Sequence, residues 1–154
     1  MPHIHEKIDF TVEVFVVCSN KVLLRKHDKY KIWLGAGGHV ELDEDPPEAA
    51  RREVKEEVGL DVELYHAHPL DFPSDGQFTD LAPPIFLNRH HISATHEHVT
   101  LVYFARAATD RLHLSTTEVS EECRWFTREE IDDPQWGIHP HIRRYALAAL
   151  DALA

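Results

Sequence analysis

Apolar residues recur along the chain with the spacings of strands and of helices, and these spacings predict where each element lies. The run FTVEVFVVC at residues 10–18 is β-branched and aromatic, as is typical of a buried strand. Ser19 and Asn20 fit a tight turn into a second strand at 21–26. Further strands are expected at 60–64, 85–92, 98–107, near 111–114 and at 123–126.

One helix has clear start and stop signals. Asp45 fits the N-cap, Pro46 the first helical position and Glu48 the third, which together make a capping box. Gly59 is placed to end the helix in the left-handed conformation. The stripe expected to face the core repeats every four residues and consists of Ala50, Val54 and Val58.

Two later segments are also expected to be helical. A helical turn is predicted at 128–132, and an amphipathic helix at 139–153. Strands combined with well-separated helices predict an α/β fold, in which a sheet lies between helices. The length of 154 residues fits one domain, residues 1–154.

Composition and charge limit the classes of partner that the protein is expected to bind. A formal net charge of −11 argues against a nonspecific grip on nucleic acid or on an anionic membrane, because both need clustered Lys and Arg. No apolar run approaches the ~20 residues that span a bilayer. The N-terminal stretch lacks the apolar region of a secretory signal, and the two distant cysteines favour reduced thiols over a disulfide. A cytoplasmic location is therefore expected.

The predicted helix gathers three carboxylates beside its core-facing stripe. Glu53, Glu56 and Glu57 lie within an arc of about 100°, where like charges repel. A solvated acidic face is one interpretation. The other is a bound divalent cation, since clustered carboxylates suit Mg²⁺ or Mn²⁺.

The spacing of glycines and acids favours the second interpretation. Gly38 is followed after five residues by Glu44 and after seven more by Arg52-Glu53, and the pattern continues to Leu60. This is the Nudix box, G-x5-E-x7-R-E-U-x-E-E-x-G-U with U apolar, matched at every specified position. The chain therefore resembles the Nudix hydrolase (MutT-like) family, which implies an α/β/α sandwich around a mixed sheet and Mg²⁺ or Mn²⁺ as cofactor.

The resemblance implies roles for the acids. Glu56 and Glu57 would be metal ligands, and Gly37, on the loop expected before the helix, would add a backbone oxygen. Glu53 would be a further ligand or the general base, while Arg52 would orient a glutamate through a bidentate contact.

Other positions carry weaker implications. Gly38 and Glu44 would brace the loop–helix–loop platform on which the family binds the diphosphate. Ala36 replaces a proline that is frequent in the family. A late acidic ligand is favoured at Glu118, with Glu97, Glu121 and Glu122 as the alternatives.

Histidines and aromatic residues supply candidates for binding. His-x-His pairs stand at 3/5, 66/68, 96/98 and 139/141, a spacing that on a strand can serve a metal. No third ligand accompanies any pair at a recognisable spacing, so surface histidines are the favoured interpretation. His39, His96 and Trp33 are candidates for substrate contact, although a core or pocket-wall position is the favoured interpretation of Trp33.

The long Pro- and Asp-rich segment 69–84 is predicted to be a loop. With Phe72 and Phe78 it is a candidate substrate lid, and a contact in a homodimer is the alternative.

The resemblance implies a hydrolase of a nucleoside diphosphate linked to a moiety X, such as ADP-ribose, another nucleotide sugar or a (d)NTP. The alternatives are a non-catalytic, ligand-sensing Nudix domain and a hydrolase of a non-nucleotide diphosphate. The expected partner is thus a small nucleotide, with no nucleic acid and no membrane.

Overall fold

The computed structural model describes residues 5–27, 29–71, 73–114 and 122–154. Its elements in chain order are β1 (Ile8–Cys18), β2 (Lys21–Lys26), β3 (Trp33–Leu34), β4 (Ala36–His39), α1 (Pro46–Val58), β5 (Val62–Leu64), β6 (Phe86–His91), β7 (Glu97–Ala107), β8 (Glu122–Phe126), α2 (Arg128–Asp132), a 3₁₀ turn (Pro134–Trp136) and α3 (Pro140–Leu153).

The strands form one mixed sheet. Its main order is β3-β2-β1-β7-β5, while β4 pairs with β1, β6 with β7 and β8 with β2. The β1–β7 pairing is parallel and runs from Ile8 opposite Glu97 to Val17 opposite Arg106. The other strand pairings found in the described residues are antiparallel.

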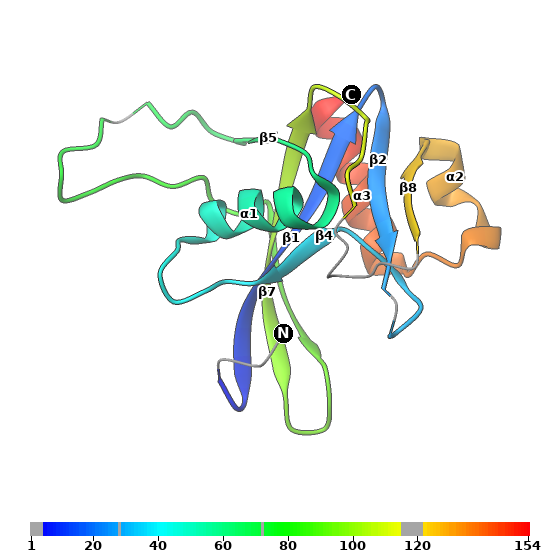
Figure 1. Cartoon of the computed structure of the whole chain (residues 1–154), viewed down its shortest axis with the longest axis horizontal. Coiled ribbons are helices and arrows are strands. Elements are labelled where there is room, and N and C mark those ends of the chain that lie inside the picture. The colour runs from blue at the N-terminus through cyan, green and yellow to red at the C-terminus, as the bar shows by residue number, and fades with distance from the viewer. Residues whose placement is uncertain (1–4, 28, 72, 115–121) are drawn as a thin grey trace.

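Helices cover both faces of this sheet. The side chains of β1 point alternately to the two faces, so each face carries apolar residues that a helix can bury. Val12, Val14 and Val16 belong to the apolar cluster that includes the Val54 and Val58 side chains of α1. Phe15 and Val17 belong to the opposite cluster, which includes Tyr145, Ala149 and Leu150 of α3. Figure 1 shows α1 in front of the sheet and α3 behind it. The predicted α/β/α sandwich with a mixed sheet is confirmed.

Local signals set the first hairpin and α1 as expected. Ser19 and Asn20 have φ of 51° and 63°, as a two-residue turn between twisted strands requires. The Asp45 carboxylate accepts the Glu48 N–H at 2.9 Å, and the Glu48 carboxylate accepts the Asp45 N–H at 3.3 Å. Gly59 ends the helix with φ of 75°. The capping box and the C-terminal glycine are therefore confirmed.

Two local predictions were wrong. The glycine-rich segment expected as a loop forms strand β4, and residues 111–114 form no strand. β4 exists because it pairs with residues 11–14 of β1, a partner far away in sequence. Residues near 113 lie beside the C-terminal end of α1 instead, where the His113 N–H donates to the Val58 carbonyl at 2.8 Å.

Strands β5 and β6 lie one after the other along β7. The Tyr65 N–H donates to the Phe104 carbonyl and the Ile85 N–H to the Val102 carbonyl, both at 2.8 Å. The chain thus leaves this sheet edge at 65 and returns to it at 85, and the segment between projects from the body (Figure 1). Phe78 on it is 76% exposed, whereas Phe72 lies outside the described residues.

In the part of the chain that the structure describes, no helix has both the length and the apolar character needed to cross a membrane.

Candidate active site

Helix α1 carries the acids of the box to its side facing β4. Glu53 and Glu57 are only 3% and 4% exposed, whereas Glu56 is exposed. Two carboxylates therefore sit at the edge of the core, where charge is costly unless it is paired.

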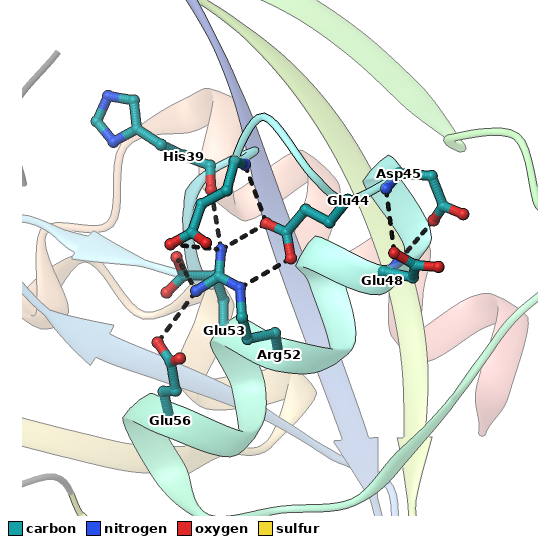
Figure 2. A network of polar contacts seen from close by, with 8 residues as sticks. His39, Glu44, Asp45, Glu48, Arg52, Glu53 and Glu56 are labelled. Atoms are coloured by element: carbon teal, nitrogen blue, oxygen red, sulfur yellow. Dashed lines mark hydrogen bonds and ion pairs between the residues drawn. The ribbon is translucent and has the colours of Figure 1, made fainter. Parts of the chain in front are cut away.

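Arg52 joins the acids into a network (Figure 2). Its Nε and Nη2 donate to the two oxygens of Glu44 at 2.9 and 2.7 Å, a bidentate pair. Its Nη1 lies 3.1 Å from Glu53 Oε1 and also 3.1 Å from Glu56 Oε2. Its Nη2 also donates to the His39 carbonyl at 3.1 Å, which ties α1 to the end of β4.

Charge pairing shifts the pKa values within this network. The hydrogen bond from Arg52 holds the pKa of Glu44 below its ordinary value, and the same bond raises the pKa of Arg52. Both groups are therefore charged throughout the physiological pH range.

Glu57 is held by a second arginine, which the sequence patterns had not singled out. Arg25 on β2 places Nε 2.5 Å from Glu57 Oε2, while the Gly37 N–H donates to Glu57 Oε1 at 3.1 Å. Glu57 thus connects α1 with β2 and β4.

Glu13 on β1 is a further acid near this site that sequence reasoning missed. Its Oε2 accepts the Gly35 N–H at 3.1 Å, and it lies opposite Gly37 in the β1–β4 register. Burial raises the pKa of Glu13 to about 7, although the Gly35 hydrogen bond and the Arg25 charge act in the opposite direction. A single carboxylate within the apolar run 10–18 was the available signal.

The glycines before α1 are needed for close packing, since none of Gly35, Gly37 and Gly38 has a positive φ. A Cβ added at Gly38 would lie 2.3 Å from Glu53 Oε1, and one at Gly37 would lie 2.0 Å from the Val12 carbonyl oxygen. The missing side chains let β4 approach both β1 and the acids of α1.

The remaining predicted residues lie apart from this network. Trp33 is buried in the α3-side core against Phe126 and Trp136, with ring centroids 5.0 and 6.2 Å away. Glu97 begins β7 and forms an ion pair with Arg89 at 3.2 Å. The favoured late ligand, Glu118, lies outside the described residues.

The backbone carbonyl and the ring of His39 lie in different surroundings. Its carbonyl meets Arg52, but its ring points away from the acids in Figure 2. The ring nitrogen Nε2 lies 3.2 Å from Asp9 Oδ2 on β1.

Comparison with known proteins agrees with this geometry. The family model described as NUDIX domain matches residues 9–147. Over 132 residues the chain is 33% identical to m7GpppN-mRNA hydrolase NUDT17 from Xenopus laevis. That match covers 79% of this chain and 42% of the relative, so the chain spans less than half of that protein's length.

Solved structures give the same answer. A NUDIX-family hydrolase from Clostridium perfringens superposes with a TM-score of 0.83 at 35% identity, covering 95% of this chain and 98% of that one. A MutT NUDIX hydrolase from Burkholderia pseudomallei shares the fold, with a TM-score of 0.66 at 21% identity over 97% of this chain and 100% of that one. With its box intact and its fold matched, the chain belongs to the Nudix hydrolase family.

Proposed function

We propose that this chain is a divalent-metal-dependent pyrophosphohydrolase that cleaves the diphosphate of a nucleoside diphosphate linked to X. The observation that carries the proposal is the excess of negative charge around α1. Five carboxylates meet two guanidinium groups there, namely those of Glu41, Glu44, Glu53, Glu56 and Glu57 with those of Arg25 and Arg52.

Mg²⁺ or Mn²⁺ fits this set of donors. The surplus negative charge on hard carboxylate oxygens suits a divalent ion. Glu56 and Glu57 would hold the ion with Glu53 and the Gly37 carbonyl oxygen. When bound, the ion neutralises the diphosphate and lowers the pKa of water at phosphorus.

The chain's own residues then have distinct tasks. Glu53 is proposed as a ligand or as the general base that takes a proton from the attacking water. Its ionised form is favoured by Arg52, whose Nη1 lies 3.1 Å away. Arg52 is in turn fixed by its bidentate pair with Glu44, so Glu44 is a positioning residue and Gly38 leaves room for the Glu53 carboxylate.

A nucleotide-derived substrate is supported by the Xenopus relative, which is named for hydrolysis of m7GpppN-mRNA. Within that class, ADP-ribose or another nucleotide sugar and a (d)NTP are the proposed substrates. The net charge of −11 is compatible with such anions because divalent ions mediate their binding.

A substrate panel tests the proposal. Product release is measured for nucleotide sugars, dinucleoside polyphosphates, (d)NTPs and an isoprenoid diphosphate, with Mg²⁺ and separately with Mn²⁺. We expect turnover of one nucleotide class to fall by a factor of about 100 or more in Glu57→Gln, because a charged ligand is lost.

Glu63→Gln is the matched control, because Glu63 is exposed on β5 and should leave the rate unchanged. Full activity in folded Glu57→Gln would contradict the proposed mechanism. Binding without turnover would favour the ligand-sensing alternative, and turnover of the isoprenoid alone would favour a non-nucleotide diphosphate.

We also propose a domain organisation, a location and an assembly for the chain. Residues 1–154 act as one domain, the location is cytoplasmic, and a homodimer is an expected assembly. Light scattering of the purified chain measures the last of these directly.

A further inference from the structure

A second cluster of ligand-type side chains lies outside the acids of α1. This His–Asp cluster consists of Asp9 on β1, His39 at the end of β4, His96 directly before β7, and His98 near the start of β7. Asp9 is directly opposite His98 in the parallel β1–β7 register, and His39 is opposite Thr11. The sheet therefore brings together the 96/98 pair and two residues from distant parts of the chain.

The cluster is buried and its polar atoms converge. Asp9 is 1% exposed, and His39 and His96 are 8% and 6% exposed. Asp9 Oδ2 lies 3.2 Å from His39 Nε2 and 3.3 Å from His96 Nε2. One ligand atom from each of Asp9, His39 and His98 lies within 4.8 Å of the other two.

The hydrogen bonds around His96 require positive charge next to Asp9, from a proton or from a metal ion. His96 Nδ1 lies 2.7 Å from the Glu6 carbonyl oxygen, which can only accept, so Nδ1 carries a hydrogen. In a neutral ring the other nitrogen, Nε2, then presents a lone pair toward a carboxylate oxygen. Two acceptors at 3.3 Å repel unless a proton or a metal ion supplies positive charge near them.

We propose that Asp9, His39 and His98 bind a first-row divalent transition ion of the Zn²⁺ type, with His96 as a positioning residue that holds Asp9. Zinc bonds of about 2.0–2.1 Å place neighbouring ligand atoms of a tetrahedron about 3.4 Å apart. The Asp9–His39 separation of 3.2 Å already has that length. Two imidazoles and one carboxylate leave a further coordination position for water.

Ligand chemistry separates this site from the acids of α1. Imidazole favours zinc and related ions, whereas carboxylates with backbone oxygen favour Mg²⁺ and Mn²⁺. The backbone carbonyl of His39 takes part in the Arg52 network, whereas its ring points away from the acids of that network (Figure 2) and lies 3.2 Å from Asp9 Oδ2. Two cavities border the cluster, one of about 540 Å³ lined in part by His96 and one of about 310 Å³ lined in part by Asp9.

Cobalt is a suitable spectroscopic probe. The full chain, without a polyhistidine tag, is stripped with a chelator and titrated with Co²⁺ in excess Mg²⁺, and visible d–d absorption is recorded. We expect one Co²⁺ per chain, displaced by Zn²⁺. Asp9→Asn and His98→Gln should weaken binding at least about 10–100-fold, the range found even for outer-shell changes.

Two controls locate the site. The double variant His66→Gln/His68→Gln removes an exposed pair with the same spacing and should bind as the wild type does. Glu57→Gln should also keep the cobalt spectrum, since it alters only the acids of α1. Wild-type affinity in Asp9→Asn and His98→Gln, or loss of the spectrum in Glu57→Gln alone, would overturn the assignment.

A measurement on the wild type tests the proposal even if the variants do not fold. X-ray absorption of the zinc-loaded chain should show imidazole scattering from two rings. A shell made only of oxygen, or no zinc retained, would refute the proposed metal site.

Discussion

At the residue scale, close approach of the backbone explains the glycines before α1 better than unusual dihedral angles do. A Cβ at Gly37 would lie 2.0 Å from the Val12 carbonyl oxygen, and that oxygen belongs to the central strand of the sheet. A flexible side chain could move aside, but a paired strand cannot without breaking hydrogen bonds.

Gly37→Ala is therefore expected to lower the free energy of unfolding by about 3 kcal/mol or more, as overpacking against backbone does. Chemical denaturation measures it. Gly76→Ala is the control, because nothing lies within 4 Å of its added Cβ, and only the left-handed conformation costs about 1–2 kcal/mol. Equal losses in the two variants would refute close approach as the cause.

Glu13 should make stability depend on pH. Its pKa rises from 4.5 in the unfolded chain to about 7 in the folded protein. The protonated form therefore stabilises the fold fully below about pH 4.5, and this contribution is lost as the pH rises through about 7. Because Glu13 keeps some solvent exposure, we expect a change of about 1–2 kcal/mol between pH 5 and pH 8.

Urea denaturation with a chelator present checks this expectation. Glu13→Gln removes the titrating group, so its stability relative to the wild type should rise over the same pH interval. Glu63→Gln is the control, because Glu63 is an exposed residue of β5. A pH profile shared by all three proteins would show that Glu13 does not titrate in this range.

The sequence identified residues of the site only where they follow one another in a fixed pattern. The acids of α1 were predicted because helical spacing places them together. Arg25, Glu13 and Asp9 come from other strands, and pairing across the sheet brings them in. The 96/98 pair was interpreted as surface histidines because its companions, Asp9 and His39, are distant in sequence.

At the scale of elements, α1 is the one most fully determined by its own residues. Both ends are set by residues within four positions, namely the Asp45 and Glu48 side chains at the start and the left-handed Gly59 at the end, so the boundaries of the helix do not depend on distant contacts. Strand β4 is the opposite case, since its glycines have low strand propensity and it forms by pairing with β1. Prediction succeeded for the helix and failed for the strand for this reason.

Asp45→Ala should therefore lower the free energy of unfolding by about 1 kcal/mol, the usual value of an N-cap. The Asp45 carboxylate accepts the Glu48 N–H at 2.9 Å, and alanine cannot replace that bond. Asp43→Ala, two residues earlier and exposed, should change stability by less than about 0.5 kcal/mol. If Asp43→Ala cost as much as Asp45→Ala, the capping explanation would be wrong.

At the scale of the whole molecule, the segment 66–84 is an insertion into one continuous strand. β5 pairs with β7 as Leu64 opposite Ala105, and β6 pairs with it as Phe86 opposite Val102. Removing 66–84 places Ile85 directly after Tyr65 and brings both strands into a single register along β7. The sequence predicted the loop from its prolines and length, but not that its two ends meet.

We expect the deletion of 66–84 to fold, with stability within about 1 kcal/mol of the wild type, because loop closure depends weakly on length. Circular dichroism and denaturation test this. A higher KM in the deletion variant would support a substrate lid, and dissociation in light scattering would support a dimer contact. Failure to fold would show that the segment packs on the sheet after all.

The parallel pairing of β1 with β7 constrains the order in which the protein can assemble during translation. β1 leaves the ribosome early, yet its parallel neighbour is complete only once residue 106 has been made. Until then one edge of the most apolar strand stays open to other nascent chains. Pairing with β7 is therefore the step that removes this edge of β1 from the reach of other chains.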